Sequence, residues 1–473
     1  MKKLIIFCLL TLLAIGLASV ASAGEYWMIV ATDGEGIAVY GSSGGGRQVG
    51  TLYNGYQNDL SLEPTNGRYS CWLTKDTVVW LNNEKAMKRL PHNVYGASSE
   101  GADQVPCSCF LAEVTEDGAG LYTGTGHKHL LAKHKAGTLL LVCGSFGKDY
   151  FVKGGGAGFM AKSALQKVKD LTFVEAWDAC YGMTDLPTAT VYVEGGRLKL
   201  ASSATGYSEV DDGMDIKHGG QVVILRDLGD WAQVAKVYEG RIGSGGFIEK
   251  RYLDPEGDHS VPTAVVKTSH PLNRLNVRYT ADKDAWSEIK LCAGVRVQVV
   301  SRGKDWTEIA IYATKGNRSV SGFVMTEYLA FGADADKVED ACVRVRLTRQ
   351  WPEYPRYYYY QYEPYPAGTE ATVFAVASGD RNIFTLQMDD GAFIDVTDDA
   401  TEPLLEPVNP TAWNAKTSKS LTLRSGPNSD SKKLGTVKSG AKVEVLLRGE
   451  KWALVRYKDK TGYVLSSGLK PIN

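Results

Sequence analysis

The sequence predicts an all-β protein, built as a tandem array of about six small β-barrels behind an N-terminal export signal. Short runs of alternating apolar and polar residues, the pattern of half-buried strands, occur along the chain. Glycine is abundant, with 51 residues in 473, which suits many short strands joined by tight turns. The third observation is a frame of apolar, glycine and aromatic residues that recurs about every 70–80 residues, one small domain per copy.

The last copy of this frame shows the pattern most clearly. Leu421 and Leu423 alternate with a polar residue on a first strand, and residues 424–428 turn the chain with glycine and proline. A turn at Gly440 separates two further alternating segments, Trp452 begins a third strand, and a Gly-Tyr-Val run opens a fourth. So many short strands within roughly 50 residues are typical of a small barrel or sandwich.

The last copy resembles the bacterial SH3 (SH3b) domain family. The residues that carry the resemblance are the strand Leu421-Thr422-Leu423-Arg424, the turn Ser425-Gly426-Pro427, Gly440, Trp452 and the run Gly462-Tyr463-Val464. The resemblance implies an SH3-like barrel without catalytic function. It also implies a binding module of a secreted or wall-associated bacterial protein, often one that binds peptidoglycan.

The same frame recurs upstream. Trp306 follows Gly294 by twelve residues, and Trp231 follows Gly219 by the same distance, as Trp452 follows its turn glycine in the last copy. The second and fifth copies keep the frame more loosely, and the first is divergent. The predicted organisation is a signal peptide at 1–23 and SH3-like repeats at 24–90, 105–168, 187–254, 264–330, 340–400 and 411–473.

The N-terminus predicts export. Lys2 and Lys3 precede an apolar run over residues 4–20, and residues 21–23 are the small residues of a cleavage site. We expect cleavage after Ala23 and a secreted, extracellular or cell-wall-associated mature chain. An uncleaved membrane anchor is the alternative. No later apolar run reaches the length of a transmembrane helix, about 20 residues.

Charge is balanced over the whole chain but not along it. A formal net charge of −1 argues against a general nucleic-acid binder. Residues 411–473 hold 13 basic against 4 acidic residues, a balance of +9, whereas residues 331–410 hold 6 against 15, a balance of −9. Such blocks would steer an anionic polymer to the last module or attract modules to one another. Solvated faces without a partner are the alternative.

Candidate ligand-binding residues gather in residues 351–366, WPEYPRYYYYQYEPYP, where the SH3-like fold has its long recognition loop. Aromatic rings stack on sugar faces or apolar peptide groups, and tyrosine hydroxyls add hydrogen bonds. The alternative is a loop that folds onto its own barrel with alternate tyrosines in the core. With the arginine of the last copy, the predicted ligand-binding residues are Trp351, Tyr354, Tyr357, Tyr358, Tyr359, Tyr360, Tyr362 and Arg424.

One cluster has metal-ligand character: His127, His129 and His134 with Cys107 and Cys109. His127 and His129 would share a strand face, a spacing compatible with ligation, but no carboxylate pattern completes a site. We therefore expect no metal and no cofactor. Seven cysteines follow the export signal, an odd number that leaves at least one unpaired in a monomer.

An enzyme would need a nucleophile with a base, paired carboxylates or a complete metal site, and the repeats leave no room for a catalytic domain. We therefore expect a non-catalytic exported protein whose linked modules bind cell-wall peptidoglycan or its peptides with avidity. The alternative is an extracellular adhesive or scaffold protein that binds other proteins, and a metal-dependent hydrolase is a remote one. The expected partners are a cell-wall glycan or peptide and other proteins, with no nucleic acid and no membrane span in the mature chain.

Overall fold

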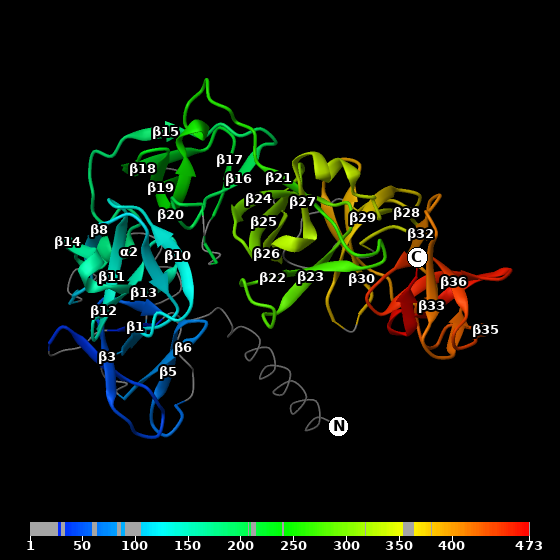
Figure 1. Cartoon of the computed structure of the whole chain (residues 1–473), viewed down its shortest axis with the longest axis horizontal. Coiled ribbons are helices and arrows are strands. Elements are labelled where there is room, and N and C mark those ends of the chain that lie inside the picture. The colour runs from blue at the N-terminus through cyan, green and yellow to red at the C-terminus, as the bar shows by residue number, and fades with distance from the viewer. Residues whose placement is uncertain are drawn as a thin grey trace, which may run out of the picture. The chain divides into compact units, whose positions relative to one another are not determined.

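The computed structural model describes residues 27–29, 34–58, 64–82, 87–89, 106–206, 208–209, 214–238, 241–316, 318–352, 364–379 and 381–472. The chain forms two compact units. The first holds the residues up to Tyr192 together with Leu200–Gly257, and the second holds Val193–Lys199 and Asp258–Asn473. Strands make up most of both units (Figure 1), which confirms the predicted all-β class. Within the described ranges, no helix is long and apolar enough to cross a membrane.

The first unit begins with two sheets. A small sheet holds β1 (Trp27–Ile29), β4 (Gln57–Asn58) and β7 (Met87–Arg89). The described strands of the larger sheet are β2 (Gly36–Tyr40), β3 (Gln48–Tyr53), β5 (Tyr69–Thr74), β6 (Thr77–Leu81), β8 (Phe110–Val114), β9 (Ala119–Tyr122), β10 (Leu130–His134), β11 (Leu139–Phe146), β12 (Asp149–Lys153), β13 (Ala157–Ala161) and β14 (Leu165–Asp170).

This larger sheet spans the predicted first and second copies. Strand β3 pairs with β11, with Leu52 opposite Gly144, so the backbone ladder continues from one copy into the next. One buried core also runs through both segments, from Ile37 to Ala164. The two segments therefore share one sheet and one buried core, and the boundary predicted between these copies stays a prediction.

A third sheet of the first unit contains β15 (Thr188–Thr190), β18 (Gln221–Leu228), β19 (Trp231–Tyr238) and β20 (Arg241–Glu249), all antiparallel. The other described elements of this unit are β17 (Asp215–Lys217), the 3-10 turns η3 (Lys162–Ala164) and η4 (Lys250–Tyr252), and helix α2 (Phe173–Trp177). Helix α2 begins with a capping box, because the Thr172 hydroxyl accepts from the Glu175 N–H and the Glu175 carboxylate accepts from the Thr172 N–H.

The second unit contains two sheets and the short strand β16 (Arg197–Lys199). The described strands of the larger sheet are β21 (Thr263–Val266), β22 (Arg274–Arg278), β23 (Ser287–Cys292), β24 (Arg296–Arg302), β25 (Trp306–Tyr312), β26 (Ser319–Met325), β27 (Leu329–Phe331), β28 (Val343–Leu347), β29 (Glu370–Ala377), β30 (Ile383–Met388), β31 (Phe393–Thr397) and β32 (Leu405–Pro407). Two 3-10 turns, η5 (Thr326–Tyr328) and η6 (Gly332–Lys337), lie near β27 in the chain.

The predicted fourth and fifth copies are also merged. Strand β23 pairs with β29, and a single buried core extends from Ala264 to Leu405 with Leu447 added from the last module. A single copy has little core, and a sheet that does not close fully leaves unpaired strand edges. Pairing two edges satisfies their backbone groups and lets both copies share one interior. The repeat boundaries drawn from the sequence stay a prediction.

The last sheet contains β33 (Trp413–Thr417), β34 (Leu421–Arg424), β35 (Lys433–Val437), β36 (Lys442–Arg448), β37 (Trp452–Tyr457), β38 (Lys460–Leu465) and β39 (Leu469–Pro471), with the turn η7 (Ser466–Gly468) before β39. Its register follows the fourth copy: Leu421 pairs with Val437 as Leu275 pairs with Leu291. A bulge interrupts the next hairpin at the same step of the frame in both segments. The equal spacing read in the sequence therefore corresponds to equal strand pairing.

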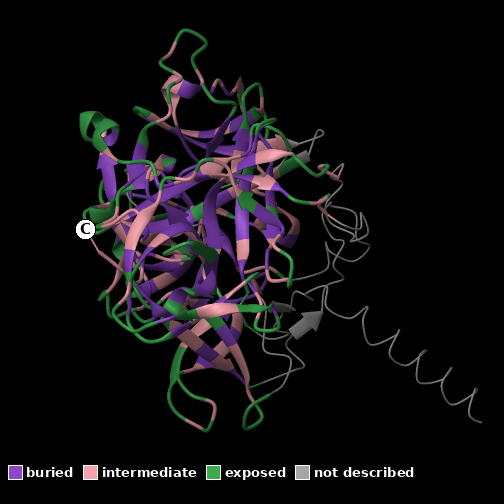
Figure 2. Cartoon of the chain, turned by 90° about the vertical axis from the view of Figure 1, so that its right-hand side faces the viewer, coloured by how far each residue is buried: buried purple, intermediate pink, exposed green. Residues whose placement is uncertain are grey.

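Burial follows the strands. In Figure 2 the buried residues concentrate on strands, and exposed residues lie mainly in turns and hairpin tips. In the last module, Leu421, Leu423, Val443 and Val445 are all buried in one cluster, as their alternation predicted. Thr422, between the two leucines, consequently faces away from this core and lines the groove described next.

Candidate functional site

A groove of about 540 Å³ lies on the last module, mainly along β34 and the turn that follows it. Its volume is within the range of small-ligand sites, roughly 300–1,000 Å³. The lining residues are Lys419, Ser420, Leu421, Thr422, Arg424, Pro427, Asn428, Ser429, Lys451, Trp452 and Leu465, together with Asp399 from the preceding segment. Arg424 is the predicted ligand-binding residue that the structure places in this groove.

Strand alternation directs Arg424 into the groove. Leu421 and Leu423 are buried, whereas Thr422 and Arg424 are only partly buried on the opposite face of β34. The guanidinium of Arg424 donates a hydrogen bond to the Ser431 carbonyl at 2.9 Å, which ties the strand to the far side of the turn. This bond uses one of the five N–H donors that an arginine carries.

The turn itself is anchored on the segment that precedes the module. The side-chain amide of Asn428 donates to the Asp399 carbonyl at 2.6 Å, and the Ser431 hydroxyl donates to the Thr401 carbonyl at 3.3 Å. A Cβ atom at Gly426 would lie 2.1 Å from the Thr401 carbonyl oxygen, so only glycine fits this approach. The groove wall is therefore held by side-chain hydrogen bonds to main-chain carbonyls of the preceding segment before any ligand arrives.

The groove combines an apolar floor with a cationic rim. Trp452 is 6% exposed, and its backbone N–H donates to the Asn382 side chain at 3.2 Å. Leu465, the strand partner of Trp452, is 37% exposed and forms the accessible part of the apolar surface. The cations are Lys419, Arg424 and Lys451.

The acidic Asp399 on the same wall is paired with Arg381 at 3.3 Å, so part of its charge is already neutralised. Such a groove suits a ligand that has a small apolar body and a carboxylate or another anionic group, because arginine pairs with carboxylates in bidentate geometry. Sequence reasoning missed Lys419, Lys451 and Leu465 as groove residues. The signal available for the two lysines was the basic balance of the last copy.

The aromatic loop is described only at its base. Trp351 and Tyr365 exchange backbone hydrogen bonds of 2.9 and 2.8 Å. The Trp351 indole N–H donates to the Asp395 carbonyl at 2.9 Å, and both side chains pack against the core shared by the fourth and fifth copies. Trp351 thus has a structural contact at the loop base. The other predicted loop residues lie outside the described residues: Tyr354, Tyr357, Tyr358, Tyr359, Tyr360 and Tyr362.

The histidines of the metal-like cluster have separate surroundings. His127 Nε2 lies 3.0 Å from an Asp149 oxygen, and His129 Nε2 lies 2.6 Å from a Glu209 oxygen. His134 is fully buried beside Phe247. Among the described residues, no three histidine, cysteine or carboxylate side chains gather as a metal site would require. Hydrogen bonding with the neighbouring thiols of Cys107 and Cys143, and then burial, raise the pKa of Cys109 well above its ordinary value.

Comparison with known proteins identifies the class of the last module. The family model described as bacterial SH3 domain matches residues 419–470. This part of the chain, which carries the groove, is therefore an SH3b domain, as the sequence predicted. A comparison with curated proteins gives no match.

Two solved structures from Trichomonas vaginalis are also similar over part of the chain. NlpC2 is 10% identical, with a TM-score of 0.15, and the match covers 48% of this chain and 92% of that protein. NlpC1 is 10% identical, with a TM-score of 0.16, and the match covers 48% and 87% of the two chains. Scores this low carry no argument about fold or activity.

Proposed function

We propose that the protein is a non-catalytic, exported binding protein whose SH3b domain takes cell-wall peptidoglycan, through its stem peptides, in the groove around Arg424. The observation that carries the proposal is the coincidence of the family match with this groove. SH3b domains generally bind cell-wall components. Stem peptides are short, contain small apolar residues and carry free carboxylates, and the groove offers an apolar floor beside three cationic side chains.

The remaining modules would contribute through linkage. A groove of this size holds a small ligand with modest affinity, and several linked modules on one polymeric wall would raise the effective affinity without new contacts. The proposal needs no reaction at the groove, since Lys419, Arg424 and Lys451 serve as hydrogen-bond and charge partners for the ligand.

Replacing Arg424 by alanine is expected to weaken binding of the full chain to purified sacculi and to soluble stem peptides about tenfold or more, because a hydrogen bond to a charged group is worth about 1.5–3 kcal/mol. Co-sedimentation and calorimetric titration measure this loss. Lys451→Gln is the second variant. Lys451 is exposed, so its replacement removes one positive charge from the same rim of the groove without altering the turn.

The matched control is Arg456→Ala on β37, where an exposed arginine pairs with Glu444 at 3.0 Å outside the groove. This variant loses the same charge from the same module. Full retention of Arg424→Ala on sacculi, or an equal loss in Arg456→Ala, would contradict the groove assignment.

One observation favours the alternative of an adhesive or scaffold protein. Tyr279 and Trp286 stack with ring centroids 5.3 Å apart and planes within 7°, yet they are 54% and 63% exposed. Exposed aromatic residues of this kind are enriched where proteins bind other proteins. The pair lies on the turn between β22 and β23, which corresponds in the frame to the groove turn of the last module.

If the alternative holds, Trp286→Ala is expected to abolish concentration-dependent association of the full chain in light scattering. Its free energy of unfolding should stay within about 0.5 kcal/mol of the parent, because the side chain is largely exposed. Trp72→Ala is the matched control, since Trp72 is 60% exposed in the other unit. A parent chain that stays monomeric at every concentration would rule this alternative out.

A further inference from the structure

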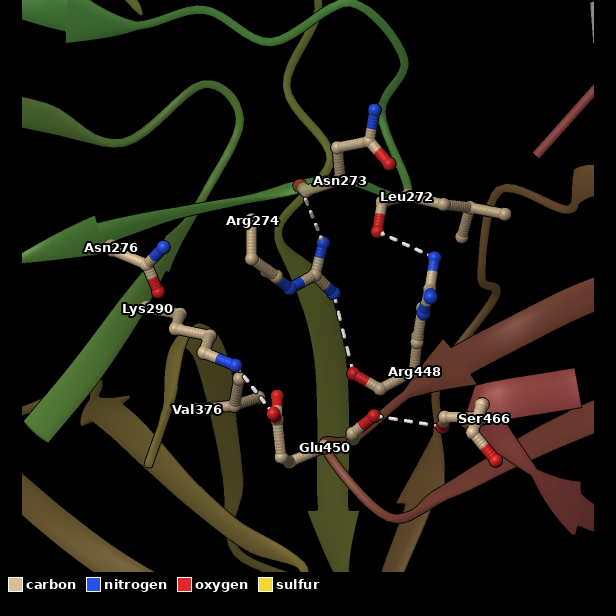
Figure 3. A pocket seen from close by; sticks show the side chains of 11 residues that line it. Leu272, Asn273, Arg274, Asn276, Lys290, Val376, Arg448, Glu450 and Ser466 are labelled. Carbon is tan, nitrogen blue, oxygen red and sulfur yellow. Dashed lines mark hydrogen bonds and ion pairs between the residues drawn. The ribbon is translucent and has the colours of Figure 1, made fainter. Parts of the chain in front are cut away.

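A second pocket, of about 350 Å³, lies where the last module meets the two preceding copies within the second unit. Figure 3 shows the side chains that converge on it. The segment from Leu272 into β22 supplies one wall, and β23 and β29 supply Lys290 and Val376. The last residue of β36 supplies Arg448, and the turn after it supplies Gly449 and Glu450. Ser466 closes the last side, with its hydroxyl bonded to the Gly449 carbonyl at 2.9 Å.

The turn approaches the neighbouring copy closely enough to require glycine. A Cβ atom at Gly449 would lie 2.0 Å from the Asn382 side-chain oxygen and 2.9 Å from the Phe384 ring. Tight packing at this point places Arg448 and Glu450, on either side of the glycine, at the pocket. The position of both charged groups is thus set by the packing between modules.

Two guanidinium groups dominate the pocket. Arg274 donates to the Arg448 carbonyl at 3.3 Å, and Arg448 donates to the Leu272 carbonyl at 3.1 Å, so each side chain is held by the other's segment (Figure 3). Further bonds of Arg274 go to the carbonyls of Pro271 and Asn273. All these acceptors are neutral main-chain oxygens. The buried Nε of Arg274 has no hydrogen-bond partner among the described residues.

The pocket carries more positive than negative charge. Lys290 is ion-paired with Glu450, so these two charges offset each other. Arg274 and Arg448 then remain as two positive charges, with Glu450 the acidic residue in the pocket lining. Burial, followed by the charge of Arg274, lowers the pKa of Arg448. Charges removed from water are normally paired with an opposite charge. Among the residues that line the pocket, the one carboxylate, Glu450, is ion-paired with Lys290, so no lining carboxylate is left to neutralise the second positive charge of the arginine pair.

We propose that this pocket binds a compact oxyanion with two negative charges, a phosphate monoester or a dicarboxylate. Arginine matches both chemistries through its planar set of donors. The ligand would bridge Arg274, from the fourth copy, and Arg448, from the last module, with the Lys290–Glu450 pair at its side. Because the two arginines lie on different modules, the bound anion would also fix these modules against each other. This site is separate from the Arg424 groove and does not depend on its assignment.

The test titrates the full chain by calorimetry with inorganic phosphate, glycerol 3-phosphate, succinate and acetate, against sodium chloride of matched ionic strength. The dianions are expected to bind at one site, and acetate at least tenfold more weakly. A preference for the two phosphates or for succinate decides between phosphate and carboxylate chemistry. Arg274→Gln and Arg448→Gln should each weaken binding at least tenfold, because a charged hydrogen-bond partner is lost.

Glu450→Gln gives a result of opposite sign. It removes the acidic group and releases Lys290, so the dianion should bind roughly fivefold more tightly, since one nearby repulsion is gone. This variant keeps the proposal testable if the arginine variants fail to fold, because both arginines also hold main-chain carbonyls. Arg456→Gln, outside the pocket, is the matched control and should bind as the parent does.

Three outcomes would overturn the proposal. They are an absence of dianion binding at millimolar concentration, equal weakening in Arg456→Gln and the pocket variants, and weaker binding in Glu450→Gln. Sacculus binding through Arg424 is measured separately, so failure of either assignment leaves the other standing.

Discussion

Replacing Phe384 by alanine is expected to lower the free energy of unfolding of the second unit by about 3–5 kcal/mol, the usual cost of emptying a buried aromatic site. Phe384 lies on β30 and is 1% exposed in the core shared by the fourth and fifth copies. Its ring also lies close to Gly449 of the last module. The cavity left by the missing ring should collapse only partly, because strands from both copies surround it.

The loss of stability should extend to both copies. Hydrogen exchange should rise in β25 of the fourth copy together with β30 of the fifth, since one core supports both. Phe331→Ala is the matched control, because Phe331 is only partly buried at the edge of this core and should cost less. Faster exchange in β30 with unchanged β25 would show that the two copies have separate cores.

The first unit is expected to lose about 3 kcal/mol of stability between pH 6.5 and pH 4 through His134 alone. The side chain is fully buried, and burial lowers its pKa from 6.5 to about 4. Unfolding restores the ordinary pKa, so below pH 6.5 the unfolded chain binds a proton that the folded chain does not. Stability is therefore present in full above pH 6.5 and falls until the folded pKa is reached, by about 1.4 kcal/mol per pKa unit.

The comparison with His134→Leu isolates this effect from the carboxylates that titrate in the same range. Neither ring nitrogen of His134 has a hydrogen-bond partner in the described part of the chain, so leucine should be tolerated at neutral pH. Urea unfolding at pH 7 and pH 4.5 should show a gap that widens in favour of His134→Leu as the pH falls. Parallel curves for parent and variant would contradict the assignment.

Local patterns in the last module predicted its strands accurately. Alternation at Leu421 and Leu423, the Gly440 turn and the strand beginning at Trp452 all appear where the spacing placed them. These features depend on neighbouring residues along the chain, through strand periodicity and turn conformation. Arg424 was predicted as a ligand-binding residue, and strand alternation in the structure places it on the face opposite Leu421 and Leu423.

The merging of copies could not be predicted in this way. The pairing of β23 with β29 uses main-chain groups, which every strand carries, so no side-chain signal marks which edges will meet. The same holds for the second pocket, where Arg274 and Arg448 come from strands far apart in the sequence. The spacing of residues along one copy contains no information about its neighbour's position.

By itself the sequence determined that this is an all-β chain and that its last segment is an SH3b domain, and it singled out Arg424 on the first strand of that domain as a candidate ligand-binding residue. Strand periodicity and turn conformation depend on a few adjacent residues, so they can be predicted from the sequence alone. Only the tertiary structure decided that neighbouring copies share cores, that Lys451 joins Arg424 at one groove, and that two arginines from different modules meet in a pocket. These features arise from packing between distant segments, and packing depends on the whole fold.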